Sequence, residues 1–514
     1  MQERSKREEG LAKGSITLFY ALMLTLILSF LFSLLEAARA ESLKRITKQD
    51  LLLSLESEFG AYHIPLWEDY RMLFLEGGNG SGELDLKMLE GNMIQESCLE
   101  QRGISIYQMV LKDLEICGYA LATDWNGAAF KEQACKAIQE QMAVNAAELV
   151  KTKLEEGKTL AEKEEELQRE WNSAQDAVKE AEKLEKEGKQ ETDSEKGEEE
   201  GEYSEGSFPS NPTEKKENLP ENPMDAVKNW KKSSVLDLVV KDPSGISEKG
   251  IKEENLLANR EKEKGNLEEP KNKKLEKLWF IQYLNHYFSC QTGKGAGGTR
   301  EHALDYELEY CIGGKETDRE NLERTVCELL LLREAGNFVT IMQDGKKQAL
   351  ALEIAAAAVG FTGLAPVIQA VKIGILLAWS YIESILDVRN LLKGGKVPLV
   401  KAVTEWKSDV SLGHQAIEKQ TEKGEGEKGM DYREYLQILL LMVRENVLVE
   451  RAMNLVEQNM RLLPGGENFR MDVMLQKTQV KGTYESQPLF LGFVTIVKAK
   501  GGTYRFVPDQ EFSY

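Results

Sequence analysis

The sequence predicts an α+β protein carried on an N-terminal transmembrane helix. Three observations lead to this expectation. Ile16–Leu35 is a run of 20 residues without a charge. Two apolar-patterned halves flank a charged middle segment, and the residues from Arg470 to Tyr514 alternate apolar and polar side chains around glycine-rich turns.

The uncharged run near the N-terminus is long enough to cross a bilayer. A helix of this length spans roughly 30 Å, whereas the apolar region of a secretory signal has only about 7 to 15 residues. Ala38-Arg39-Ala40 fits the small-x-small pattern of a signal-peptidase site. The length of the run favours an anchor that is retained, as do the charged residues Glu36 and Arg39 between its end and the candidate cut.

The orientation of this anchor is less clearly encoded. Residues 1–15 and residues 36–50 each carry four Lys or Arg side chains, so the excess of positive charge that marks a cytoplasmic flank is missing. A short N-terminal tail before a large domain is the usual signal-anchor arrangement. We therefore expect a single-pass protein of the cell membrane with its N-terminus inside and its bulk extracytoplasmic.

The overall charge is acidic, with 66 Lys and Arg against 86 Asp and Glu and a formal net charge of −20. A nucleic-acid-binding surface needs clustered cations, so we expect no nucleic-acid partner. Six cysteines occur without any C-x-x-C spacing. Their pairing cannot be read from the sequence.

Half of the net charge lies in the middle of the chain, where residues 151–276 carry 24 basic and 34 acidic side chains. Leu160, Leu167, Ala174 and Ala181 recur every seven residues, which is typical of a long solvated helix or a coiled coil. The segment beyond Gly188 has the composition of a linker. The expected domains are a cytoplasmic tail at 1–15, a transmembrane helix at 16–35, an N-terminal ordered region at 42–142, a long charged helix at 143–187, an acidic disordered linker at 188–274 and a C-terminal α+β region at 275–514.

In the N-terminal region, Leu66–Gly78 shows a helix-like stripe that two glycines end. Thr123 or Asp124 is a candidate helix start, and Asn126-Gly127 is a turn signal. From Ala128 an amphipathic helix is expected to continue into the charged segment.

In the C-terminal region, "LWFIQYLNHYFSC" and "HALDYELEYCIGG" alternate apolar and polar residues around a glycine-rich connection, which indicates a β-hairpin; the first run could equally be helical. Thr317 and Glu320 have the spacing of a helix capping box, and Gly336 is a candidate helix end. Ser233–Val240 could form a strand or a helical turn. Two or three strands are expected to close the chain.

The uncharged stretch Ile354–Val371 could be a second membrane span. It contains Gly360, Gly363 and Pro366, and Lys372 follows it directly. A buried helical hairpin that breaks near Pro366 fits this pattern better, because each half is then no longer than a core helix.

The remaining motifs do not predict chemistry. Gly293-x-Gly295-x-x-Gly298 matches a phosphate-cradling loop only formally, since a strand-like run follows it where a helix is required. A zinc site could be drawn from one set of His and Cys side chains, but its spacing fits no standard module, so cysteine pairing is favoured over metal: the set is His286, Cys290, His302 and Cys311. We expect no enzyme, and no catalytic, cofactor-binding or metal-binding residues.

Several stretches resemble an uncharacterised family of Gram-positive bacterial membrane proteins, catalogued as a domain of unknown function. They include "GSITLFYALMLTLILSFLFSLLEAARA", "LWEDYRMLFLEGG", "TDWNGAAFKEQACKAIQEQM", "HALDYELEYCIGGKETDRENLERTVCELLLLREAGNF" and "LLKGGKVPLVK". The resemblance implies genes beside those of tight-adherence (Flp/Tad-type) pilus or secretion machinery. The family has no assigned catalytic residues that could be carried over to this chain.

A likeness to the minor pilin-like proteins of that machinery is weaker. Lys13-Gly14 looks like a processed leader, but Phe19 stands where the pilin-like pattern has Glu. The expected function is a membrane-anchored structural or accessory component with protein partners in an envelope assembly. The alternative is a surface binding or adhesion module on a charged stalk.

Overall fold

The computed structural model describes residues 2–97, 106–141, 157–159, 162–194, 224, 227–228, 234–240, 243–269, 277–296, 300–408, 428–490 and 502–514. The chain forms two compact units. Unit 1 comprises Met1–Gln133, Glu261–Lys273 and Leu463–Tyr514, and unit 2 comprises Ala134–Arg260 and Lys274–Leu462. The expected α+β class is confirmed, with an N-terminal apolar helix and C-terminal strands.

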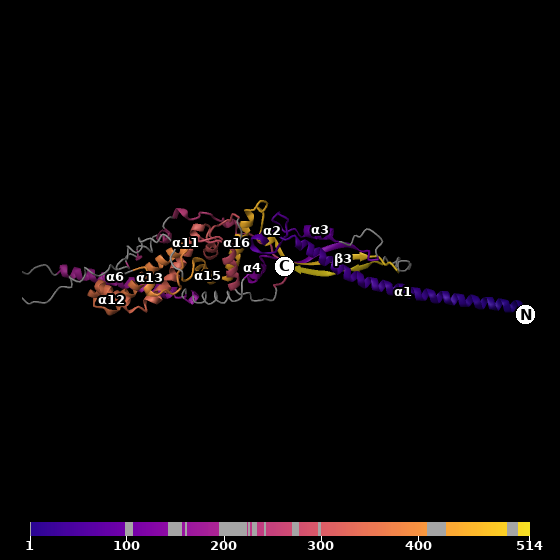
Figure 1. Cartoon of the computed structure of the whole chain (residues 1–514), viewed down its shortest axis with the longest axis horizontal. Coiled ribbons are helices and arrows are strands. Elements are labelled where there is room, and N and C mark those ends of the chain that lie inside the picture. Colours follow the sequence, from indigo (N-terminus) through magenta and orange to yellow (C-terminus); the bar gives the residue numbers. More distant parts are fainter. Residues whose placement is uncertain are drawn as a thin grey trace, which may run out of the picture. The chain divides into compact units, whose positions relative to one another are not determined.

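Unit 1 combines the beginning and the end of the chain around one antiparallel sheet (Figure 1). The strand β3 (Met474–Ser486) pairs with β2 (Val110–Leu121) along one edge. Its other edge pairs in turn with β1 (Leu75–Glu76), β5 (Asp509–Ser513) and β4 (Tyr504–Phe506). The long strand β3 therefore holds this sheet together.

Two helices of unit 1 pack on this sheet, α1 (Gln2–Gly60) and α3 (Leu86–Glu96). The short helix α2 (Ile64–Tyr70) lies between them in the chain. Leu51, Leu55 and Phe59 of α1 follow one another at i, i+4 spacing and enter a core with Leu475 and Val480 of β3. Side chains on β3 alternate between buried and partly buried, as expected for a strand with one face on a core.

Unit 1 corrects the expected helix over Leu66–Gly78. The helix α2 ends at Tyr70, because Arg71 takes a left-handed conformation with φ of 55°. The chain then becomes extended, and β1 pairs with β3. The expected turn at Asn126-Gly127 is present, since both residues have positive φ near the start of α4 (Asp124–Gln141), a helix that contains the boundary between the units.

Unit 2 is mainly helical. Its longer elements in the described residues are α6 (Glu164–Ser194), α9 (Lys277–Tyr287), α10 (Glu307–Gly313), α11 (Asp318–Ile341), α12 (Gly345–Val359), α13 (Ala365–Leu392), α15 (Tyr432–Met442) and α16 (Glu445–Arg461). Its short helical turns are α8 (Val235–Val239), η2 (Pro243–Gly245), η3 (Glu253–Asn255), η4 (Leu257–Asn259), η5 (Gly360–Thr362) and η6 (Val403–Glu405); η8 (Met471–Val473) precedes β3 in unit 1.

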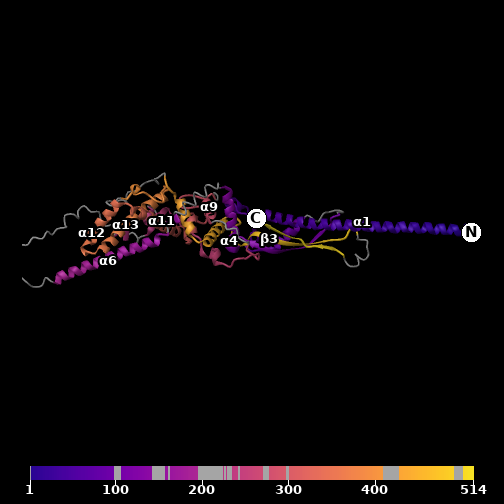
Figure 2. The ribbon, with the colours of Figure 1, turned by 90° about the horizontal axis from the view of Figure 1, so that it is seen from below.

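The helix α13 is the centre of unit 2, and α6, α11 and α12 pack against it (Figure 2). The expected hairpin near Pro366 is present: α12 and α13 are joined through η5, and Pro366 lies in the first turn of α13. The second arm is longer than expected, because α13 continues for 28 residues. Lys372 on α13 donates to Gln348 of α12 across the hairpin.

The charged helix α6 is packed rather than solvated or paired in a coiled coil. Its side chains Trp171, Ala174 and Ala181 are buried within unit 2, to which α6 belongs. A Cβ atom added at Gly374 of α13 would lie 2.6 Å from the Cβ atom of Ala174. Two small residues thus let α6 and α13 approach closely, so the seven-residue pattern marks a helix-packing face.

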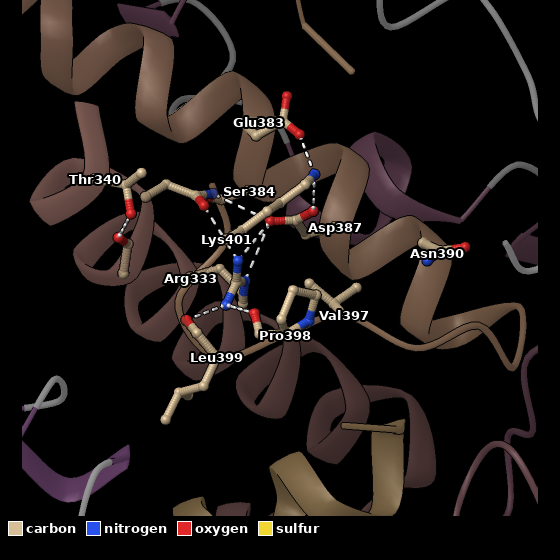
Figure 3. Close-up of polar contacts among 12 residues, drawn as sticks. Arg333, Thr340, Glu383, Ser384, Asp387, Asn390, Val397, Pro398, Leu399 and Lys401 are labelled. Atoms are coloured by element: carbon tan, nitrogen blue, oxygen red, sulfur yellow. Dashed lines mark hydrogen bonds and ion pairs between the residues drawn. The ribbon is translucent and has the colours of Figure 1, made fainter. Parts of the chain in front are cut away.

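An ion network is buried between α11 and α13 (Figure 3). Arg333 of α11 lies 2.9 Å from Asp387 of α13, and Lys401 binds both Asp387 and Glu383. Burial raises the pKa of Asp387, but the opposing effect of Arg333 and Lys401 is larger, so this pKa lies below its usual value. Two cations and two carboxylates therefore compensate one another in the core.

The expected hairpin between "LWFIQYLNHYFSC" and "HALDYELEYCIGG" is wrong. Both runs are helical, in α9 and α10, which supports the alternative weighed for the first run. The alternation in the second run misleads because its polar positions are not solvated. Glu307 and Glu309 are fully buried and accept hydrogen bonds from Ser289 and Gln291.

Two helix signals on α11 had different outcomes. The Thr317–Glu320 capping box is confirmed. Gly336 does not end the helix, which continues to Ile341. Gly336 is buried in a helix that packs along its length, and such packing outweighs the cost of a helical glycine, about 1 kcal/mol.

Part of the expected linker over residues 188–274 is folded. The segment 243–260 belongs to unit 2, where its side chains Ile251 and Leu257 are buried. The segment 261–269 belongs to unit 1, where Gly265 donates its backbone N–H to Asp124. Ser233–Val240 contains the helical turn α8, one of its two expected forms. The composition of the linker concealed these few buried apolar residues.

Candidate functional site

The most informative site in unit 1 is the place where α1 changes from exposed to buried. The uncharged window of α1 has no buried residue, and its mean hydropathy is 2.4. Burial begins at Glu36, directly after the uncharged run, and then repeats every three or four residues along one face of the helix: Glu36, Arg39, Leu43, Thr47, Asp50, Ser54 and Glu58. A single helix thus carries an apolar segment and a core-packing segment.

An ion pair marks the start of the buried face. Arg39 lies 2.8 Å from Glu36 on the same side of α1, and both side chains are at least 95 % buried. Arg39 also donates to the Ser486 hydroxyl and to the carbonyl oxygens of Gln487 and Ile106. Glu36 accepts the backbone N–H groups that lead out of β3, at Leu489 and Phe490. We call this pair and its contacts the α1 clamp.

The α1 clamp fixes two chain segments to the helix. One precedes β2 and contains Ile106, and the other follows β3 and contains Phe490. The ring of Phe490 stacks on Phe32 of α1, with centroids 6.3 Å apart. Charge-assisted hydrogen bonds of this kind are the stronger ones in proteins, so the segment after β3 is held firmly beside α1.

The candidate signal-peptidase site Ala38-Arg39-Ala40 lies within the continuous helix α1. Its central residue is the buried arginine of the clamp. Sequence reasoning used Glu36 and Arg39 only as charges beyond the apolar run. Their i, i+3 spacing directly after that run was the signal that they form a pair on one helix face.

A cavity of about 550 Å³ lies in unit 2 beside the glycine-rich connection. Its lining includes Cys290, Gly293 and His302, together with Lys249 and Asp305, which form an ion pair at 2.9 Å. Gly293 pairs with Cys290 in an isolated bridge, and no helix begins within the described residues that directly follow Gly295. Gly298, the third glycine of the pattern, lies outside the described residues, and the described part of the loop has no helix N-terminus of the kind that cradles phosphate.

Glu309 is fully buried next to Gln291, which lines this cavity, and its pKa is raised. Its burial raises its pKa to about 7, although hydrogen bonds from the Gln291 N–H and the Tyr432 hydroxyl act in the opposite direction. Burial likewise raises the pKa of the Cys290 and Cys311 thiols, and both sulfurs are thereby kept in the unreactive neutral form.

Two of the residues considered for zinc, His302 and His286, lie beside other charged groups. His302 lies 2.9 Å from Glu307, while burial, with Arg433 nearby, lowers the pKa of His286. No group of three or more His, Cys, Asp or Glu side chains suited to a metal occurs among the described residues. Among the described cysteines, Cys117, Cys290, Cys311 and Cys327 form no disulfide, and Cys98 lies outside the described residues, so the expected cysteine pairing stays a prediction.

Two helices among the described residues are long and apolar enough to cross a membrane. They are the segment Ile16–Gly60 of α1 and the helix α13. In α13, 61 % of the apolar window is buried inside the protein, and the helix carries Glu383 and Asp387 of the ion network. These features are those of a core helix of a folded unit.

These features define an α+β protein with an N-terminal helix that is a candidate membrane span. The chain belongs to the family of unknown function DUF5702, whose model matches residues 213–486, more than half of its length. This confirms the expected membership of an uncharacterised family, although the matched residues leave out the N-terminal stretches that carried part of the resemblance. No curated protein and no solved structure matches the chain.

Proposed function

We propose that this protein is a membrane-anchored, extracytoplasmic structural component of an envelope assembly. The observation that carries the proposal is the boundary on α1: its apolar window contains no buried residue, and burial starts at Glu36. The exposed apolar side chains of this 20-residue uncharged run are costly in water, at roughly 25 cal/mol per Å² of apolar surface. A bilayer removes that cost, whereas a soluble protein would leave it uncompensated.

The continuity of α1 supports a structural role. No flexible hinge separates the apolar segment from the part of α1 that packs on β3 and β5. The α1 clamp adds charge-assisted hydrogen bonds at the boundary itself. A unit held this way keeps a fixed orientation to the membrane, which suits a component that must present a surface to neighbouring subunits.

The resemblance to proteins encoded beside tight-adherence (Flp/Tad-type) genes gives the proposal its finer content. We infer a single-pass protein of a Gram-positive bacterium whose N-terminus is inside and whose two units lie outside. In this arrangement α13 is the core helix of unit 2 and does not cross the bilayer. Its buried carboxylates, Glu383 and Asp387, support this assignment, because charged groups are expensive at the bilayer centre.

Membrane retention is tested by carbonate extraction of membranes, followed by mass spectrometry of the N-terminus. We expect the chain to stay in the membrane fraction with residues 16–35 intact. Recovery of a soluble form that starts at Glu41 would show that the apolar run is a cleaved signal.

Topology is tested with single cysteines at Ser81 and Leu462, two exposed positions before and after α13. The exposed Cys117 is replaced by serine in the parent chain, which serves as the blank. A membrane-impermeant reagent should label both positions in intact cells. Protection of Leu462 until permeabilisation would instead make α13 a second span.

The assembly role is tested by crosslinking in the native cell and identification of the neighbours. Crosslinks to subunits of a secretion ATPase complex or its membrane platform would support it. Crosslinks only to host or matrix ligands would favour the adhesion alternative.

A further inference from the structure

A second apolar surface lies beside the point where α1 leaves its apolar segment. Ile106 is 54 % exposed and Tyr107 45 % exposed in the segment before β2. Leu489 is 48 % exposed in the segment after β3. Together with Phe490, these residues are called the membrane-end patch. Exposed apolar side chains that cluster in this way mark an interaction surface.

The position of the patch along α1 is fixed by direct contacts. Phe490 stacks on Phe32, which precedes Leu35 by three residues and therefore lies about 5 Å inside the uncharged run. Ile106 and Gln487 are tied to Arg39, one turn beyond that run. The patch is thus at the same level as the end of the apolar segment.

The hydrogen bonding of the patch also fits a lipid environment. Backbone N–H groups in lipid must find partners within the protein, and the side chain of Glu36 accepts those of Leu489 and Phe490. The carbonyl oxygens of Ile106 and Gln487 accept from Arg39. Tyr107 adds an aromatic ring of the kind enriched at membrane interfaces.

We propose that the membrane-end patch lies in the headgroup–acyl boundary of the bilayer that α1 crosses, so that unit 1 contacts lipid through the segments that flank β2 and β3 as well as through its helix. The occupant is lipid because the patch is continuous with the exposed apolar window of α1. The inference rests on the proposed anchor. A second contact beside α1 would restrict the tilt and rotation of unit 1 on the membrane.

The test uses the full chain in vesicles of phosphatidylcholine and phosphatidylglycerol. A diazirine-bearing photocrosslinking amino acid replaces one residue at a time, at Leu489 or Ile106 in the patch. The matched control is Leu53, an exposed leucine on α1 that lies about 27 Å beyond Leu35. Leu26, in the middle of the apolar run, tests the anchor itself. Phospholipid adducts are quantified by mass spectrometry after irradiation.

We expect phospholipid adducts at Leu26, Leu489 and Ile106, each at least tenfold above the yield at Leu53. Adducts at Leu26 but only the Leu53 level at Leu489 and Ile106 would overturn the inference and leave the anchor intact. Crosslinks from the patch to a second copy of the chain in place of lipid would overturn it as well. Absence of lipid at Leu26 would overturn both the anchor and the patch.

Discussion

Replacing Arg333 by methionine should destabilise unit 2 by about 3–5 kcal/mol, because it leaves a buried carboxylate without its main partner. Arg333 is fully buried, and its guanidinium donates to Asp387 (Figure 3). It also donates to Asn337 and to the Tyr435 hydroxyl. Methionine keeps much of the apolar stem but removes every donor. Asp387 would then retain Lys401 and Asn337 only.

The matched control is Arg324→Met on the same helix. Arg324 pairs with Glu328 at the surface, and its side chain is 58 % exposed, so its loss should cost less than about 1 kcal/mol. Both variants are compared by denaturant unfolding of the full chain in detergent micelles, followed through tryptophan fluorescence. Trp379 and Trp406, which pack together in unit 2, report on its unfolding. Equal losses in the two variants would refute the view that the network is a compensated buried charge cluster.

Three further predictions concern single positions. Because the folded-state pKa of Glu309 is about 7 and its ordinary value is 4.5, its stabilising effect is complete below pH 4.5 and is lost as the pH rises through 7. Between pH 4.5 and 8, the free energy of unfolding of unit 2 should therefore fall by about 3 kcal/mol more in the natural protein than in the Glu309→Gln variant. Parallel curves of unfolding free energy against pH for the two proteins would contradict this. Gly374→Ala should destabilise the packing of α6 on α13 by about 1–3 kcal/mol. Gly360→Ala should not, because the space around its added Cβ atom is open, so only the Gly374→Ala variant should have a lowered melting temperature. Arg39→Met should speed proteolysis of the segment after β3, while Arg45→Met, at an exposed position of the same helix, should leave it unchanged in time-resolved digestion.

Local signals in the sequence were sufficient for features that local chemistry determines. The Thr317–Glu320 cap, the turn at Asn126-Gly127 and the break near Pro366 all occur in the structure. Each depends on backbone requirements of one or two residues. The apolar run of α1 is similarly explicit, since its length and composition alone make it a candidate membrane span.

Features that depend on long-range burial were predicted poorly. The alternation around Glu307 and Glu309 indicated a strand, but both carboxylates are buried in a helix. The strand β2 was missed, although Leu114, Ile116 and Ala120 carry the period-two signal of a half-buried strand. Its partner β3 lies more than 350 residues later, and no local pattern reveals such pairing.

The α1 clamp shows the same limit at the candidate site. Glu36 and Arg39 were recognised as charges beyond an apolar run, but their partners come from the far end of the chain, at Ser486 and Leu489. A charge pair at i, i+3 is normally a solvated surface feature worth a few tenths of a kcal/mol. Only the return of the end of β3 to the middle of α1 turns this pair into a buried junction.

The family match covers only one of the strands in the sheet of unit 1. The matched residues 213–486 contain the whole of β3, whereas β1 and β2 precede the match and β4 and β5 follow it. Every strand that pairs with β3 therefore lies outside the matched region, and a fragment limited to that region would expose two unpaired strand edges. The matched region also omits α6, whose alanines pack on α13. Residues 213–486 are thus not a self-sufficient folding unit, and the helix that is the candidate membrane span is also the helix that covers β3. The candidate membrane span and the core of unit 1 therefore share one helix.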